Sequence, residues 1–119
     1  MFNQPLLVLF LISCIIVAAQ CQPRLISQEV IICEGKYNKI ECPDRMKIKI
    51  TSAFYGNSGY SVCGSDKNIE CFNHSTLVKV HNICYGKYDC VLMADNEGFG
   101  NRCPAGHNHL KVGFTCERF

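Results

Sequence analysis

An alternation of apolar and charged side chains runs through residues 46–51, with the sequence Met-Lys-Ile-Lys-Ile-Thr. Successive side chains of a β-strand point to opposite faces of its sheet, so a period of two residues predicts a strand with one buried face. Lys47 and Lys49 are then expected on the face that meets water. This is the clearest strand pattern in the chain, and the neighbouring segments can be placed around it.

We expect further strands at residues 29–33, 39–42, 91–93 and 110–116. From Ser75 the spacing changes, and it predicts a short helix that is capped by Ser75, ends near Gly86 and buries Leu77, Val80, Ile83 and Cys84. Residues 56–68 are rich in Gly, Asn, Ser and Asp, which predicts a loop. The predicted fold class is therefore α+β: a small disulfide-rich domain of antiparallel strands with one or two short helices and long ordered loops.

Length and charge limit the kinds of function to consider. A chain of 119 residues has room for one domain. Twelve Lys and Arg against ten Asp and Glu leave a net charge of +2. So small an excess gives no argument for binding nucleic acid or an anionic membrane.

The N-terminal segment has the character of a secretory signal. Residues 6–19 are apolar, and no charged side chain occurs before Arg24. This run is too short to span a bilayer comfortably but has the length of a signal core. Val17 and Ala19 occupy positions −3 and −1 of a cleavage site before Gln20, although the segment lacks a Lys or Arg near its start. We predict a signal peptide at residues 1–19, an N-terminal arm at 20–29 and one domain at 30–117, secreted and extracellular; the alternative is an uncleaved anchor.

Ten cysteines are present, and nine remain after residues 1–19 are removed, because only Cys14 lies within them. In an oxidising compartment they are expected to form disulfides rather than to bind metal or act as thiolates. Eight of them run from Cys33 to Cys116 and allow 105 pairings, among which spacing does not choose. Cys21 is the extra one. We expect it to join two chains in a disulfide-linked homodimer; the alternative is cleavage after Cys21, which leaves a monomer.

Two other kinds of chemistry receive little support. A metal site would have to use the pair His107 and His109, or His74 with His81, and neither pair has a carboxylate or free thiol beside it in sequence. The acidic residues are scattered, mostly beside turn residues, and no nucleophile–base arrangement is apparent. We therefore expect no enzymatic activity, and neither a metal ion nor another cofactor.

Several short motifs, taken in order, suggest a family. They are Cys33-Glu34-Gly35, Ala53-Phe54-Tyr55-Gly56, Cys84-Tyr85-Gly86-Lys87 with Cys90, Phe99-Gly100-Asn101-Arg102-Cys103 and the closing segment from Leu110 to Cys116. Together they resemble the sea-urchin-egg-lectin type domain, the rhamnose/galactose-binding lectin family that also occurs in latrophilin ectodomains. The resemblance covers about residues 30–117. It implies the disulfide pairs Cys33–Cys63, Cys42–Cys116, Cys71–Cys103 and Cys84–Cys90.

The same resemblance implies a monosaccharide site that has diverged. The family's opening glutamate, its motif tyrosine and an asparagine are kept as Glu34, Tyr55 and Asn96. The family's aspartate is replaced by Asn101 and its lysine by Asn108. Sugar recognition needs acceptors for adjacent hydroxyls, donors for ring oxygens and an apolar surface, which these residues still provide. Charge-assisted hydrogen bonds are about twice as strong as neutral ones, so we expect weaker or altered sugar binding.

The sequence thus predicts a secreted lectin of the galactose/rhamnose class, whose partners are cell-surface or secreted glycans. The alternative is a secreted protein-binding module that kept the scaffold and lost the sugar. Neither nucleic acid nor, after signal cleavage, a membrane span is expected. Asn73-His74-Ser75 is an N-glycosylation sequon, and we expect Asn73 to be exposed and to carry a glycan.

Overall fold

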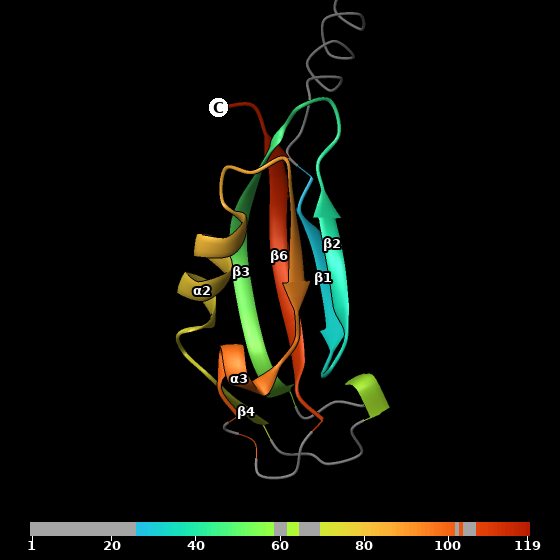
Figure 1. Cartoon of the computed structure of the whole chain (residues 1–119), viewed down its shortest axis with the longest axis vertical. Coiled ribbons are helices and arrows are strands. Elements are labelled where there is room, and N and C mark those ends of the chain that lie inside the picture. The colour runs from blue at the N-terminus through green and yellow to red at the C-terminus, as the bar shows by residue number, and fades with distance from the viewer. Residues whose placement is uncertain (1–25, 59–61, 65–69, 102, 104–106) are drawn as a thin grey trace, which may run out of the picture.

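The computed structural model describes residues 26–58, 62–64, 70–101, 103 and 107–119 (Figure 1). The elements follow in the order β1 (Gln28–Cys33), β2 (Tyr37–Glu41), β3 (Lys47–Ser58), the 3₁₀ turn η1 (Val62–Gly64), β4 (Glu70–Phe72), α2 (Thr76–Cys84), β5 (Asp89–Met93), α3 (Asn96–Phe99) and β6 (His109–Glu117). This confirms the α+β class. The predicted signal peptide and Cys21 lie outside the described residues.

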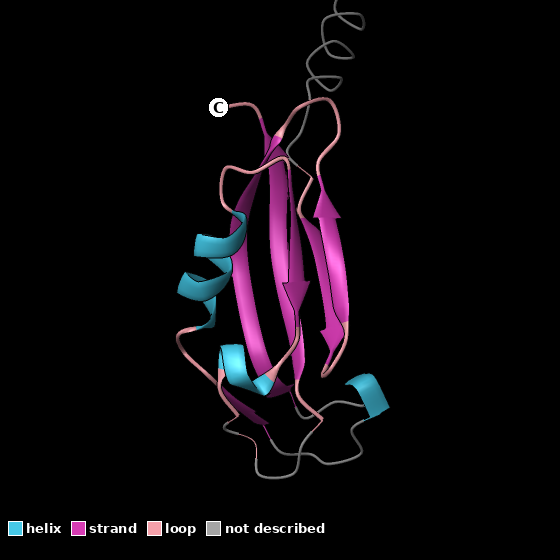
Figure 2. Cartoon of the chain, in the orientation of Figure 1, coloured by secondary structure: helices cyan, strands magenta, loops and turns pink. Residues whose placement is uncertain are grey.

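The main sheet has four antiparallel strands in the order β1-β6-β3-β4 (Figure 2). β6 lies between β1 and β3, and every residue from 109 to 115 except Lys111 is buried, as expected for a central strand. A second, two-stranded sheet pairs β2 with β5. Helix α2 packs against β3 and β5, and its buried side chains are Thr76, Val80 and Cys84.

A β-bulge in β3 decides which of its side chains face the core. Ile48 and Ile50 lie opposite Cys116 and Phe114 of β6, but beyond a register shift between Ile50 and Ser52 it is Ala53 and Tyr55 that lie opposite Val112 and Leu110. One extra residue reverses the phase of an alternating strand. The bulge therefore turns Tyr55 into the core and leaves Phe54 on the other face of the sheet.

Four disulfides hold these layers together. They join Cys33 to Cys63, Cys42 to Cys116, Cys71 to Cys103 and Cys84 to Cys90. These are the same pairs that the family resemblance implied. The pair Cys42–Cys116 connects the end of β2 to β6, and so ties the two-stranded sheet to the main sheet.

Two local predictions were wrong in part. Residues 56–58 are not loop but the end of β3, where they pair with β4 at Phe72, Cys71 and Glu70. Such a polar, glycine-containing segment becomes a strand only because β4 is there to pair with it. Helix α2 begins where expected, but Ser75 makes no side-chain capping bond to it.

The exposure of two segments also differs from expectation. Leu77 and Ile83 of α2 are exposed rather than buried, because the buried face follows positions 76, 80 and 84. Asn73 is half-buried rather than exposed, and its Nδ2 donates a hydrogen bond to the Phe99 carbonyl at 2.6 Å. Within the described part of the chain, no helix is long and apolar enough to cross a bilayer.

Candidate functional site

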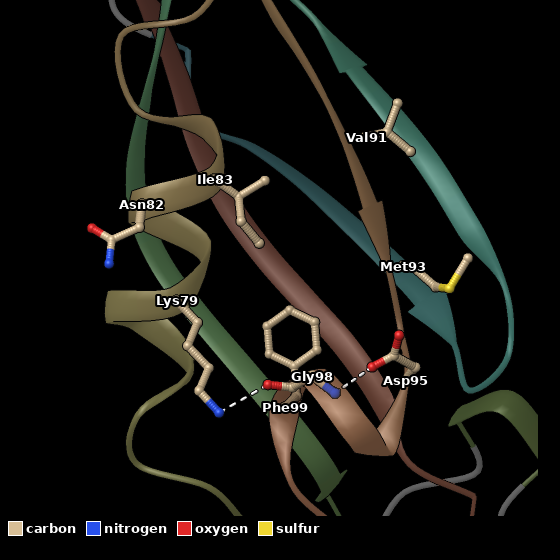
Figure 3. A pocket seen from close by; sticks show the side chains of 8 residues that line it. All are labelled: Lys79, Asn82, Ile83, Val91, Met93, Asp95, Gly98 and Phe99. Atoms are coloured by element: carbon tan, nitrogen blue, oxygen red, sulfur yellow. Dashed lines mark hydrogen bonds between the residues drawn. The ribbon is translucent and has the colours of Figure 1, made fainter.

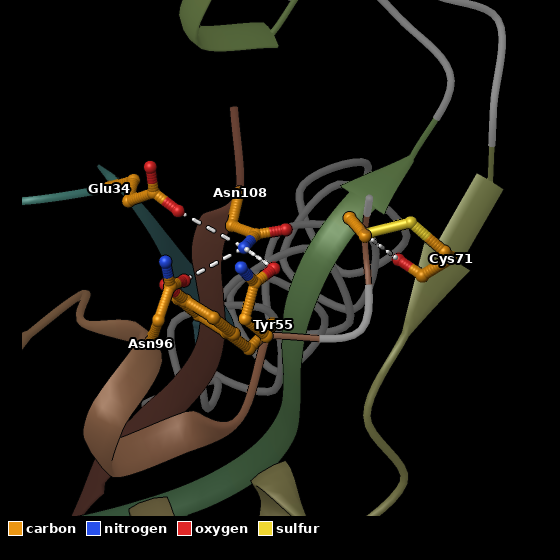
Figure 4. Close-up of a disulfide and its surroundings, with 7 residues drawn as sticks. Glu34, Tyr55, Cys71, Asn96 and Asn108 are labelled. Atoms are coloured by element: carbon orange, nitrogen blue, oxygen red, sulfur yellow. Dashed lines mark hydrogen bonds between the residues drawn. A yellow bond between two sulfur atoms is a disulfide. The ribbon is translucent and has the colours of Figure 1, made fainter. Parts of the chain in front are cut away.

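Five residues from separate parts of the sequence meet at one end of the main sheet, and Figure 4 labels all of them except Asn101. Glu34 follows β1, Tyr55 lies in β3, and Asn96 begins α3. Asn101 follows α3, and Asn108 comes directly before β6. These are the five residues to which the family resemblance assigned a role in sugar binding, and the structure brings all of them together.

Asn108 is at the centre of their hydrogen bonds. Its Nδ2 lies 2.8 Å from Asn96 Oδ1 and 3.1 Å from both Glu34 Oε1 and Asn101 Oδ1. The Tyr55 hydroxyl donates to Asn96 Oδ1 at 2.7 Å. Three acceptor oxygens lie on one side of the Asn108 side-chain amide, so the amide must turn its nitrogen, and not its oxygen, toward them. Asn108 Oδ1 is then buried with no partner among the described residues.

Burial divides the five residues into two groups. Tyr55 and Asn108 are each only 1% exposed, whereas Glu34 and Asn96 are half-buried and Asn101 is exposed. A ligand arriving from solvent therefore meets Glu34, Asn96 and Asn101. Tyr55 and Asn108 lie beneath them and hold their oxygens in place.

The backbone around the site explains why these side chains converge. The Glu34 N–H donates to the Asn108 carbonyl at 3.0 Å, and the Gly35 N–H donates to the Ala94 carbonyl at 2.7 Å. The short helix α3 is capped by Asp95, whose Oδ1 accepts from the Gly98 N–H. Asp side chains are favoured at this position because they satisfy an N–H that the helix leaves free. The loop after β1, helix α3 and the start of β6 are thus linked by hydrogen bonds.

Sequence reasoning missed Asp95 and Phe99. The Phe99 ring stacks on Tyr55 with ring centroids 5.2 Å apart, which fixes the tyrosine beneath the polar cluster. An Asp three residues before a glycine is a recognisable start of a helical turn, so Asp95 had a local signal. The stacking of Phe99 on Tyr55 had none, because the two residues are 44 positions apart.

Burial is the main cause of a raised pKa at Tyr55. Burial, together with the negative charges of Glu34 and Asp95, raises the pKa of Tyr55 to about 12. At neutral pH the phenol is a neutral group, and its hydroxyl donates a hydrogen bond to Asn96 Oδ1. Glu34 takes part in none of the ion pairs found in the described part of the chain.

His109 follows Asn108 and is itself buried, with an exposed fraction of 2%. Its ring lies 5.3 Å from that of Phe54, and its Nδ1 has no partner among the residues described. Burial, reinforced by the charge of Lys111, lowers the pKa of His109 from its usual value. The folded chain thus holds a neutral imidazole against Phe54, on the face of the sheet opposite Tyr55.

This burial predicts a pH dependence of stability. Below about pH 6.5, His109 becomes protonated in the unfolded chain but stays neutral in the folded chain. The free energy of unfolding should therefore fall as the pH drops from about 6.5 toward the lowered pKa of His109 in the folded state. Urea unfolding between pH 4.5 and 7.5 measures this. His109→Phe should flatten the slope, whereas His81→Gln, at an exposed position, should leave it unchanged. An unchanged slope in His109→Phe would contradict the prediction.

A separate groove of about 520 Å³ lies on the other side of α3, between α2 and β5 (Figure 3). Its apolar lining comes from Ile83, Val91, Met93 and Phe99. The charged groups at its edge are already bonded within the protein: Lys79 Nζ donates to the Gly98 carbonyl at 2.8 Å, and Asp95 accepts from the Gly98 N–H. The groove therefore offers an apolar surface and few free groups to orient a sugar. In the described part of the chain, no cluster of His, Cys, Asp and Glu is arranged to hold a metal ion.

Comparison with known proteins gives the family. Residues 40–116, more than half of the chain, match the family model of the D-galactoside/L-rhamnose binding SUEL lectin domain. The chain belongs to the SUEL lectin family. The matched span of this SUEL lectin domain contains Tyr55, Asn96, Asn101 and Asn108, and Glu34 lies just before it.

Individual relatives agree with this assignment. The chain is 33% identical over 91 residues to the L-rhamnose-binding lectin ELEL-1 of Echinometra lucunter, covering 73% of the chain and 88% of that protein. It is 33% identical over 90 residues to the D-galactoside-specific lectin of Heliocidaris crassispina, covering 71% and 86%. It is also 30% identical over 100 residues to latrophilin Cirl of Drosophila mojavensis, covering 81% of the chain but only 6% of that protein. The SUEL lectin domain thus forms most of the two sea urchin proteins and a small part of the third.

Proposed function

We propose that this chain is a secreted single-domain lectin of the galactose/rhamnose class with a diverged sugar site. Glu34, Asn96 and Asn101 would contact the sugar, and Tyr55 and Asn108 would position them. The observation that carries the proposal is that all five residues, which come from five separate segments, converge in one hydrogen-bonded cluster at the end of the sheet. The two relatives of which the match covers 88% and 86% are named for binding L-rhamnose and D-galactosides, which supports the sugar class.

The proposal also includes processing and assembly. Residues 1–19 would be removed as a signal peptide, leaving the arm at 20–29 and the domain at 30–117. A disulfide-linked homodimer through Cys21 would carry two sugar sites, which a one-domain lectin needs to cross-link glycans. Both remain predictions from the sequence.

Glu34→Ala tests the sugar site directly. Glu34 is the accessible carboxylate of the cluster, and losing a charge-assisted acceptor costs about 1.5–3 kcal/mol, or roughly 10- to 150-fold in affinity. Titration calorimetry with galactose and rhamnose measures the loss. Glu97→Ala, on the exposed face of α3, is the matched control and should bind as the unmodified chain does. If Glu34→Ala binds sugar normally and melts at the same temperature, the site lies elsewhere.

The second candidate function is a protein-binding module. It is favoured by the apolar groove between α2 and β5, and by the exposure of Val91 and Met93 at its edge. A glycan array, probed with monomeric and dimeric protein, separates the two functions. Binding that free galactose or rhamnose abolishes supports the lectin, and silence of both forms across the array supports a protein ligand.

Glycosylation is a further part of the proposal. In a eukaryotic host we expect one N-glycan at Asn73, added while the chain is still unfolded, because the folded chain half-buries this side chain and engages its Nδ2. Removal of N-glycans by an amidase should lower the apparent mass of the secreted protein. Ser75→Ala destroys the sequon and should abolish the shift. If the unmodified protein shows no shift, the sequon is unused.

A further inference from the structure

The cluster around Asn108 has more acceptors than hydrogens. Three oxygens, from Glu34, Asn96 and Asn101, lie 2.8–3.1 Å from Asn108 Nδ2. An amide nitrogen carries only two hydrogens, so it cannot serve all three at once. The Tyr55 hydroxyl supplies one more hydrogen, which it donates to Asn96 Oδ1. The buried Asn108 Oδ1 adds another acceptor with no partner in the described part of the chain. Within the described part of the chain, the site therefore has fewer hydrogen-bond donors than acceptors.

Among the described residues, no cation pairs with the carboxylate of the site. Glu34 bonds to a neutral amide, and none of the ion pairs among the described residues includes it or Asp95. The charges of both carboxylates act on the Tyr55 hydroxyl, which places the cluster in a negative field. Among the described cations, Lys79 has its Nζ on the Gly98 carbonyl, facing the groove on the other side of α3, and Lys36, two residues after Glu34, takes part in none of the ion pairs.

A ligand that carries an ammonium group would supply both hydrogen-bond donors and a positive charge. An ammonium has three hydrogens, and its positive charge adds a Coulomb attraction to a carboxylate that a hydroxyl lacks. Glu34 and Asn101 each present an acceptor at the accessible side of the cluster. We infer that this site selects amino sugars with a free, protonated amine over the corresponding neutral and N-acetylated sugars. The inference rests on the proposed function, because it concerns the same site.

The test compares three matched ligands on the full chain: galactose, galactosamine and N-acetylgalactosamine. Titration calorimetry at pH 6.5 and low salt should show about tenfold tighter binding of galactosamine than of the other two. The preference should weaken as salt is raised, because the site is open to solvent on one side. N-acetylgalactosamine is the decisive control, since it keeps the nitrogen and removes its charge.

Two variants show where the preference comes from. Glu34→Gln removes the carboxylate with little change of shape, so galactosamine and galactose should bind it with similar affinity. Asn108→Lys would place an ammonium among the three oxygens and should likewise abolish the preference, if it folds. Glu97→Gln, which changes the same charge at an exposed position of α3, should keep it.

The outcomes separate this inference from the function on which it rests. If galactose and galactosamine bind the unmodified chain equally, the amine preference is wrong and the lectin proposal stands. If a preference exists but persists in Glu34→Gln, the amine is bound elsewhere and the inference is overturned. If no sugar in the set binds, both the inference and the proposed galactose-class site fail.

Discussion

Replacing Cys42 and Cys116 together by alanine is expected to lower the free energy of unfolding by about 4.5 kcal/mol, which follows from the entropy of closing so long a loop in the unfolded chain. The two cysteines are 74 positions apart in sequence, the largest separation among the four disulfides. Their bond also joins the sheet of β2 and β5 to the main sheet. For a domain of this size the melting temperature should fall by roughly 20–35 °C. Thermal and urea unfolding measure both quantities.

Cys33 and Cys63 provide the matched control, because all four cysteines are half-buried. Their separation is 30 residues, for which the same treatment gives about 3.7 kcal/mol. The double alanine variant of this pair should therefore be the more stable of the two. The reverse order would show that loop entropy does not govern these bonds.

Gly56→Ala is expected to destabilise the fold by about 2–6 kcal/mol, through a steric clash and backbone strain together. A Cβ added at Gly56 would lie 2.1 Å from the Cys71 carbonyl oxygen and 2.7 Å from the Phe72 Cα. Both are backbone atoms of the paired strand β4, which cannot move aside as a flexible side chain would. The φ angle of +154° adds strain for any residue with a side chain.

Gly35→Ala separates the clash from the backbone conformation. Gly35 also has a positive φ, of +81°, but a Cβ there would meet no atom within 4 Å. Its cost should be limited to about 1–2 kcal/mol. Comparable melting temperatures for the Gly56→Ala and Gly35→Ala variants would mean that β4 can move away from the added methyl group. The pairing of β4 with β3 would then contribute little to stability. A clear difference would show that the end of β3, beside Tyr55, depends on close strand contact.

The candidate site was foreseen through motifs, but its arrangement was not. Family resemblance pointed to Glu34, Tyr55, Asn96, Asn101 and Asn108, and the structure brings these five together. Nothing local to Asn108 indicates that it is buried or that its nitrogen faces three oxygens. That depends on the loop after β1, on α3 and on the start of β6 meeting at one end of the sheet. The roles of Asp95 and Phe99 arise from the same meeting.

The sequence by itself determined the α+β class, the positions of the main strands and the family, because alternation, helical spacing and motif order are all local properties of the chain. It also carries the predictions of a signal peptide and of a dimer through Cys21. Only the tertiary structure decided which face of β3 is buried beyond residue 51 and that residues 56–58 form a strand. The physical reason is that register and burial are set by partners distant in sequence. Tyr55 reaches the site because β6 pairs across a bulge, and Gly56 is constrained because β4 lies against it.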